Sequence, residues 1–413
     1  SDALAYTRKF EGFVKSALFF ALPIMAGAVD PVAYVLNTNG ETLSKISLYT
    51  GAVNNNIVVI GSDADCYPNQ IVIRDTLAYV IASGTDEIQI VNLNTEQSLG
   101  FINTGAFSNP YWMDFYDSRY LYVTLQLNNS LAKIDVIDRK KLIEIPVGLS
   151  PAGLAITNNK VYVANSRYDY GTGGWESPGT VSVLDAVSGM IIKTIEVDLN
   201  PQFMAVDDLG RVHVVCTGDY YTVPGVVNVI DPVGDTVVAS LVTGGSPGQI
   251  SIGPDHTAYL AAAGWTSAGF VYTYNALTLQ AYHISGNPIE VDWNCMTAVA
   301  YQDSTCFTGS FTDYINVIDS AGVNQGRYAV GSGPIHIDFN YLPGDATGDF
   351  AVDLLDILLL IDWIYNEGPP PAYPLWRGNA NGDDAYNLLD ILHLISYVYS
   401  EGARPVAGPR WVR

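Results

Sequence analysis

The chain has 413 residues, enough for two or three domains of ordinary size. Its 42 acidic and 19 basic residues give a formal net charge of −23, which disfavours nucleic acid and anionic membrane surfaces as partners. Apolar residues make up 48% of the chain, so a large core is expected, and abundant Gly and Tyr favour strands and turns over helices.

The first segment, residues 1–30, contains a basic stretch followed by an apolar run from Ala17 to Ala28. This arrangement is typical of a secretory signal peptide, and the run is too short to form a stable transmembrane anchor. If the segment is instead retained, its apolar side chains must be buried against a partner. The side chains that would need this partner are Leu18, Phe19, Phe20 and Leu22. Both alternatives stay open.

Seven related units follow in residues 31–341. A proline that opens a short apolar stretch recurs at Pro68, Pro110, Pro151, Pro201, Pro247, Pro288 and Pro334. Strand patterns come after the first six of these prolines, and several of them alternate apolar and polar residues, as in Val181–Asp185. Four short strands per unit of about 40–50 residues are typical of a propeller blade, because one unit cannot bury both of its faces. We therefore expect a mainly β, seven-bladed β-propeller.

The two ends of the repeat predict how the ring closes. The first unit begins at Ala33 without a proline strand, and the last proline stretch, Gly333–Phe339, has no unit after it. We expect this stretch to be the innermost strand of the first blade, which removes an open sheet edge. The units resemble YVTN-type propeller repeats, most closely in residues 147–197, where the chain reads VGLSPAGLAITNNKVYVANS and TVSVLDAVSGMIIKTIEV. The resemblance implies the fold but no particular activity.

The central channel is where a propeller would hold a catalytic site. The residues two positions after each proline should face it: Gln70, Trp112, Gly153, Phe203, Gln249, Glu290 and His336. Glu290 and His336 could meet from neighbouring blades, as a lyase or hydrolase would require, although a satisfied polar pair is the more ordinary interpretation. We predict no catalytic residue and a protein that is not an enzyme.

An insertion, Arg167–Pro178, lengthens the fourth blade and carries Trp175 among tyrosines. It is either a recognition loop or a surface insertion without function. Cys295 and Cys306 could be cross-strand neighbours in one hairpin, either bonded or free, while the other two cysteines are expected to be buried thiols.

Two related loops lie in residues 342–403, beginning 34 residues apart and reading DATGDFAVDLLD and NANGDDAYNLLD. Oxygen-bearing side chains occupy positions 1, 3, 5, 9 and 12 of both loops, a spacing that suits Ca²⁺, with a backbone carbonyl at position 7. The expected ligands are Asp345, Thr347, Asp349, Ala351, Asp353 and Asp356 in loop one, and Asn379, Asn381, Asp383, Ala385, Asn387 and Asp390 in loop two. Loop one has more carboxylates and should bind more tightly. The alternative is a pair of acidic turns without metal.

Each loop leads into an apolar helix, and the duplicated loop-helix resembles a dockerin domain. In that family, loop positions 10 and 11 help contact a cohesin partner; here these positions hold Leu354, Leu355, Leu388 and Leu389. The resemblance implies a hydrophobic docking surface, although the leucines could form the module's own core. Position 6 favours Gly but holds Phe350 and Asp384, a departure from the pattern. Residues 404–413 are expected to be a tail.

Together these features predict a secreted structural protein, located outside the cell or on its surface. The propeller would be a rigid body, joined through the calcium-stabilised module and the N-terminal segment into a filament of head-to-tail copies, or to a cohesin-like protein. One alternative is a carbohydrate- or protein-binding propeller tethered to a cohesin-type scaffold. A second is a propeller lyase or hydrolase.

Overall fold

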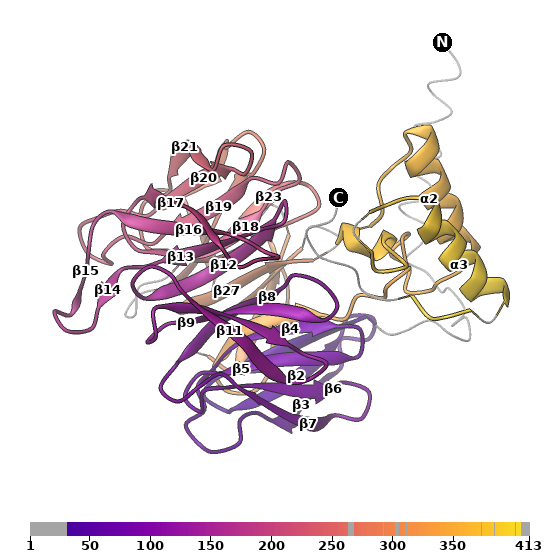
Figure 1. Cartoon of the computed structure of the whole chain (residues 1–413), viewed down its shortest axis with the longest axis horizontal. Helices are drawn as coiled ribbons and strands as arrows, with labels where there is room; N and C mark the ends of the chain where they lie inside the picture. Colours follow the sequence, from indigo (N-terminus) through magenta and orange to yellow (C-terminus); the bar gives the residue numbers. More distant parts are fainter. Residues whose placement is uncertain are drawn as a thin grey trace, which may run out of the picture.

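The computed structural model describes residues 31–262, 268–291, 293–301, 305–310, 312–319, 321–372, 374–383, 385–400 and 402–405. A ring of β-sheets carries a small helical module at one end (Figure 1). The N-terminal segment, with Leu18, Phe19, Phe20 and Leu22, lies outside the described residues.

Seven antiparallel sheets form the blades, so the prediction of a seven-bladed propeller is confirmed. From the inner to the outer strand, blade one contains β31 (Pro334–Phe339), β1 (Val32–Asn37), β2 (Thr42–Ser47) and β3 (Val53–Val59); blade two contains β4 (Pro68–Arg74), β5 (Leu77–Ala82), β6 (Glu87–Asn92) and β7 (Gln97–Asn103); blade three contains β8 (Pro110–Phe115), β9 (Tyr120–Leu125), β10 (Ser130–Asp135) and β11 (Lys140–Pro146).

The other blades follow the same order. Blade four contains β12 (Pro151–Thr157), β13 (Lys160–Asn165), β16 (Gly179–Asp185) and β17 (Ile191–Val197), and its insertion forms a hairpin of β14 (Tyr168–Asp169) and β15 (Gly174–Trp175). Blade five contains β18 (Pro201–Val206), β19 (Val212–Cys216), β20 (Val226–Asp231) and β21 (Thr236–Val242). Blade six contains β22 (Pro247–Ile252), β23 (Thr257–Ala262), β24 (Gly269–Asn275), β25 (Ala281–His283) and β26 (Ile289–Val291); blade seven contains β27 (Cys295–Ala300), β28 (Cys306–Ser310), β29 (Tyr314–Ile318) and β30 (Asn324–Ala329).

The ring closes as predicted, through strands from both ends of the propeller sequence. β31 pairs antiparallel with β1, bringing Leu36 opposite His336 and Val35 opposite Ile337. The backbone N–H of Val32 also donates to the Asn340 side chain over 2.7 Å. Six of the seven repeated prolines begin an inner strand, where the missing N–H costs no ladder hydrogen bond.

Blade seven differs from the prediction. Pro288 precedes β26, which pairs with β24 at the outer edge of blade six, and the inner strand of blade seven begins at Cys295 instead. The register places Cys295 opposite Ser310 and Cys306 opposite Ala300, so the two cysteines are not cross-strand neighbours. All four cysteines are buried, and none of them forms a disulfide bond.

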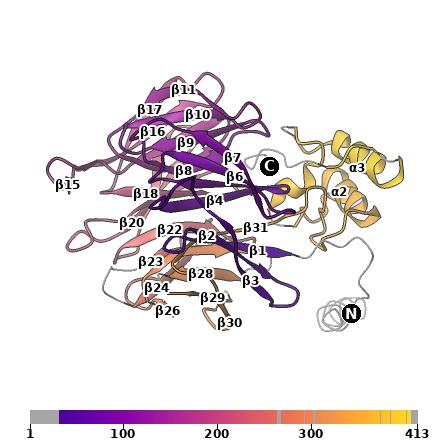
Figure 2. The same cartoon turned by 90° about the horizontal axis from the view of Figure 1, so that it is seen from below.

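The ring has two distinct ends. The connection face carries the links between blades and between the second and third strands of each blade. Its described loop residues are 38–41, 60–67, 83–86, 104–109, 126–129, 147–150, 166–178, 198–200, 217–225, 243–246, 268, 293–294, 312–313 and 330–333. The opposite end is the module face. The hairpin β14–β15 and the helices α2 (Leu354–Asn366) and α3 (Leu388–Ser400) lie at opposite ends of the molecule (Figure 2).

Phe350 attaches the module to the propeller. Its side chain is 8% exposed and belongs to the apolar cluster between blades seven and one, which includes Val35, Ile337 and Phe339. A short 3-10 helix, η1 (Leu375–Gly378), lies between α2 and α3 in the chain. Its Leu375 lines the channel cavity, so the linker reaches the module-face end of the channel.

Candidate functional site

Loop one folds around the side chain of its first residue. Asp345 Oδ1 accepts the N–H of Gly348 over 2.8 Å and of Asp349 over 3.0 Å, while its Oδ2 accepts the N–H of Phe350 over 3.0 Å. The Thr347 hydroxyl lies 3.4 Å from Asp345 Oδ1 and 3.0 Å from Asp356 Oδ1. Oxygens from positions 1, 3 and 12 therefore meet inside the loop.

The twelfth residue ties the loop to the helix that follows. Asp356 Oδ1 accepts the N–H of Thr347 over 2.9 Å, and its Oδ2 accepts the N–H of Asp353 over 2.8 Å. Asp353 in turn accepts the N–H of Leu355 over 2.7 Å and is the N-cap of α2, so residues at positions 9 and 12 form a capping box. These carboxylates thus have a structural role that does not depend on metal.

Loop two repeats this arrangement with fewer charges. Asp390 accepts the N–H of Asn381 over 3.3 Å and of Asn387 over 2.9 Å, and Asn387 accepts the N–H of Leu389 over 2.7 Å. Asn379 at position 1 is fully buried, and its Oδ1 has no hydrogen-bond partner. A buried carbonyl oxygen without a partner costs free energy, which a cation at this position would offset.

The residues of both loops fit a hard cation. Burial raises the pKa of Asp345 and Asp390, and it raises the pKa of Asp356 to about 6, because no water solvates the charged carboxylates. The described residues hold no group of three or more His, Cys, Asp or Glu side chains placed to bind a metal, and the neutral Thr347, Asn379 and Asn381 account for part of the predicted ligand set. Calcium therefore stays a prediction.

Arg377, the only basic residue in 344–402, has a role that sequence reasoning missed. Its side chain is fully buried and pairs with Asp345, and its guanidinium lies 5.5 Å from the Tyr341 ring centre and 5.3 Å from that of Phe350. This ion pair supplies one positive charge to loop one from within the chain. The sequence signal was present, since a lone Arg among ten acidic residues is unusual, but its partner was not deducible.

The leucines at positions 10 and 11 of each loop face outward. Leu354, Leu355, Leu388 and Leu389 are 47–56% exposed, and Leu358 and Leu392 one turn later are also exposed. Other side chains form the core of the module: Ala346, Ile357, Leu360, Ala380, Ile391 and Leu394. The interpretation that the leucine pairs form this core is therefore wrong, and two matching apolar surfaces remain on the helices.

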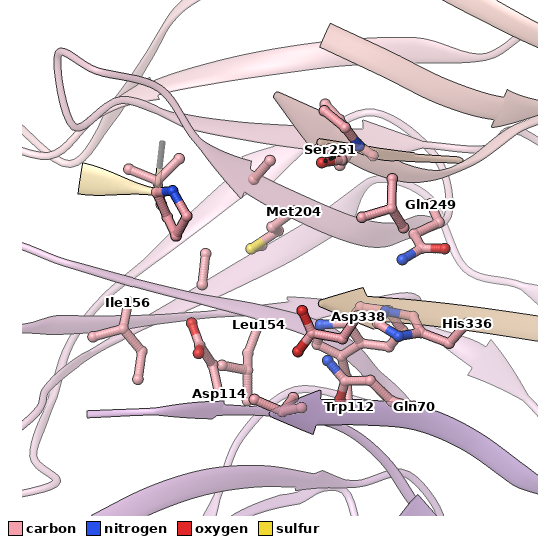
Figure 3. A pocket seen from close by; sticks show the side chains of 18 of the residues that line it. Gln70, Trp112, Asp114, Leu154, Ile156, Met204, Gln249, Ser251, His336 and Asp338 are labelled. Carbon is pink, nitrogen blue, oxygen red and sulfur yellow. Dashed lines mark hydrogen bonds between the residues drawn. The ribbon is translucent and has the colours of Figure 1, made fainter. Parts of the chain in front are cut away.

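A cavity of about 320 Å³ lies in the central channel (Figure 3). Of the residues predicted to face the channel, four line this cavity: Gln70, Trp112, Gln249 and His336. Phe203 and His336 each pack edge-to-face against Trp112, with ring centres 5.1 and 5.2 Å away. A Cβ at Gly153 would lie 2.5 Å from the Gln202 carbonyl, so glycine is needed there for close packing of blades four and five.

The predicted meeting of Glu290 and His336 is wrong. Glu290 is exposed on β26, at the outer edge of blade six, whereas His336 lies on the inner strand β31. The error has a physical reason, since the proline that precedes Glu290 begins an edge strand and not an inner one. The one acid–base pair that the sequence suggested, Glu290 and His336, is therefore not formed.

Among the comparisons with known proteins, only the one with solved structures found similar proteins, and it supports the fold alone. No protein-family model matches the chain, and no curated protein matches its sequence. A functionally unknown protein from Desulfotomaculum acetoxidans is similar in structure, with 14% identity, a TM-score of 0.58, and coverage of 76% of this chain and 99% of that one. Hydrazine synthase from Kuenenia stuttgartiensis is similar with 15% identity, a TM-score of 0.53, and coverage of 67% and 90%. Among the described residues, no helix is long and apolar enough to cross a membrane. At these identities the likeness establishes a propeller fold alone.

Proposed function

We propose that this chain is a secreted structural protein without enzymatic activity, in which a rigid propeller is linked to a partner through the C-terminal module. One observation carries the proposal: two leucine pairs at equivalent places on α2 and α3 are about half exposed, although the chain has a separate core for the module. Exposed apolar groups repeated in this way suit burial in a protein interface.

Calcium is the proposed stabiliser of this connector. Bound Ca²⁺ would supply positive charge to the buried oxygens of Asp345, Asp356 and Asp390, and to the unpartnered Oδ1 of Asn379. The loops set the start of α2 and α3 through their caps, so a cation in the loops would fix the direction of the leucine pairs.

The partner is either a cohesin-like protein or another copy of this chain. Residues 1–30, if retained, bring an apolar run that could dock on the leucine pairs of a neighbouring copy. A contact between two different surfaces does not close on itself, so it would generate a filament of head-to-tail copies. Intact-mass measurement of the native protein tests this version, and a mature chain that begins near Val29 would contradict it.

The connector role itself is tested by substitution. The double variant Leu355→Ser, Leu389→Ser should weaken self-association or cohesin binding about tenfold or more, as measured by analytical ultracentrifugation with Ca²⁺. Leu142→Ser on the outer strand β11, which also changes an exposed leucine, is the matched control. Unchanged association in the double variant would contradict the proposal.

A second candidate function is a carbohydrate- or protein-binding propeller carried by the module. The observation that favours it is the position of exposed aromatic side chains, five of which lie at the connection face: Tyr67, Phe107, Tyr170, Tyr221 and Trp293. In the described loops of the module face, Tyr49 is the only exposed aromatic side chain. Binding of a labelled ligand to the full chain, lost when these rings are removed, would test this function.

A further inference from the structure

The insertion in blade four builds a row of aromatic rings with a loop of blade five. The rings of Tyr170, Tyr168, Trp175 and Tyr220 follow one another, with neighbouring centres 4.9, 5.1 and 5.6 Å apart. We call these four residues the aromatic row. Tyr221, next to its end, is 91% exposed. The row runs across the connection face, away from the helices.

Carboxylates hold both loops of the row in fixed shapes. Asp169 accepts the N–H of Gly171 over 2.8 Å and the Thr172 hydroxyl over 2.9 Å. Asp219 accepts the Thr222 hydroxyl over 2.7 Å and the N–H groups of Tyr221, Thr222 and Val223 over 2.7–2.9 Å, and these bonds, the hydroxyl first, lower the pKa of its carboxyl. The loops are therefore ordered before any ligand arrives, which reduces the entropy lost on binding.

The row is also tied to blade three through a polar side chain. The Tyr170 hydroxyl donates to Gln126 Oε1 over 3.0 Å, and Asn109 Nδ2 donates to the same oxygen over 3.0 Å. Amide and hydroxyl groups thus lie beside the ring of Tyr170, which is 56% exposed, whereas Tyr168, Trp175 and Tyr220 are partly buried. Aromatic faces bordered by such groups suit a ligand that has both apolar C–H surfaces and hydroxyls.

Charge narrows the class of ligand further. Arg167 is the only basic residue in loops 166–178 and 217–225, and it pairs with Glu176. The same loops carry Asp169 and Asp219, so a sulfated, phosphorylated or uronic-acid ligand would be repelled.

We propose that the aromatic row and Tyr221 bind a neutral polysaccharide, whose sugar rings stack on the aromatic faces while its hydroxyls donate to the bordering oxygens. The inference rests on the second candidate function and gives it a place and a ligand class. It does not depend on calcium or on the leucine pairs, because the hairpin β14–β15 and the helices of the module lie at opposite ends of the molecule (Figure 1).

Affinity electrophoresis of the full chain tests the proposal. Native gels would contain a neutral β-glucan, xyloglucan or galactomannan, or the anionic polymer alginate as a comparison. At least one neutral polymer should slow the protein, and alginate should not. The variants Trp175→Ala and Tyr221→Ala should each reduce the affinity about tenfold, whereas Tyr399→Ala on α3 should not change it. The Tyr221 side chain packs little on the protein, so that variant should keep the wild-type melting temperature.

The outcomes separate the possible occupants. No retardation by any neutral polymer, or undiminished retardation in both variants, would overturn the proposal. Binding of a synthetic peptide of residues 1–30, lost in the same variants and without polysaccharide binding, would overturn it in favour of a protein partner. Retardation that persists in chelator, while the module loses its Ca²⁺-dependent melting, would show that the connector and the ligand site are independent.

Discussion

Phe350 holds a backbone conformation that normally belongs to glycine. Its φ is +65°, which is strained for a bulky residue, and yet its ring is buried in the core between blades seven and one. The turn at position 6 of loop one requires this φ, and the aromatic side chain adds an attachment to the propeller that glycine could not supply. The departure from the expected loop pattern is therefore explained by contact between the module and the ring.

Two substitutions at this position separate strain from packing. Phe350→Ala should destabilise the attachment by about 3–5 kcal/mol, because it removes a buried ring. Phe350→Gly loses the same packing but relieves the positive φ, so its cost should be about 1 kcal/mol smaller. Thermal unfolding and limited proteolysis of the linker measure both effects. Equal destabilisation by the two variants would contradict the role of strain.

The burial of His213 predicts that the stability of the propeller depends on pH. The ring is fully buried, with Nδ1 2.7 Å from the Tyr274 hydroxyl and Nε2 3.2 Å from Asp207 Oδ2. Burial lowers its pKa below the usual value of 6.5, although the Asp207 carboxylate opposes this shift. Below about pH 6.5 the unfolded chain binds a proton that the folded chain does not, so the free energy of unfolding should fall as the pH decreases.

Urea unfolding at pH 7.5 and pH 5 measures this effect. The wild-type chain should lose stability between these two values, and His213→Gln should be less stable at pH 7.5 but lose less on acidification. Arg211 also pairs with Asp207, so the carboxylate stays charged over this range and contributes little to the slope. Parallel losses in the wild-type chain and the variant would contradict the assignment to His213.

At the scale of elements, the two loops should differ in their response to calcium. If the loops bind Ca²⁺ as proposed, chelation should unfold the module and leave the propeller transition in place, because the loops would lose the cation that offsets their buried oxygens. Asp345→Ala should destabilise the module more than Asn379→Ala, since it removes a loop-one carboxylate and with it the buried ion pair to Arg377.

Calorimetry with and without Ca²⁺ separates the two parts of this effect. The destabilisation that comes from losing the ion pair with Arg377 should persist in chelator. The destabilisation that comes from losing a metal ligand should appear only with Ca²⁺. Asp63→Ala, at an exposed propeller aspartate, is the control. A melting profile that is the same in Ca²⁺ and in chelator would contradict the calcium proposal.

The blades were predictable because their strands are local patterns. Proline at the start of an inner strand and alternation of apolar residues are visible in the sequence, and both follow from the geometry of a sheet edge and a buried face. The inner strand of blade seven was not predicted, because it begins with Cys295 where the other blades have proline. Pro288 misled for the converse reason, since proline is also tolerated in an edge strand such as β26.

The candidate sites were predictable only in part. Loop spacing identified the oxygen-bearing residues, since these lie within twelve positions of one another. The partner of Arg377 and the burial of Phe350 depend on segments that meet only in the folded chain, so no local sequence pattern predicted them.

At the scale of the whole molecule, ring closure should dominate stability. Deleting residues 332–341 removes β31 and exposes the inner edge of β1, so we expect loss of the soluble fold. Deleting residues 168–175 removes the whole hairpin β14–β15 and should leave the propeller melting temperature within a few degrees. Soluble expression and circular dichroism measure both. A stable chain without β31 would mean that another strand closes the ring.

The pairing of β31 with β1 also affects how the chain is made. Leu36 pairs with His336, 300 positions further along, so β1, the first propeller strand in chain order, waits for nearly the whole propeller to be translated. During this time β1 presents an unpaired edge, which invites pairing with other nascent chains. The module, which begins just after β31, can attach only to a closed ring. An interrupted translation product that stops before residue 339 should therefore aggregate or be degraded, and should not survive as a shorter working protein.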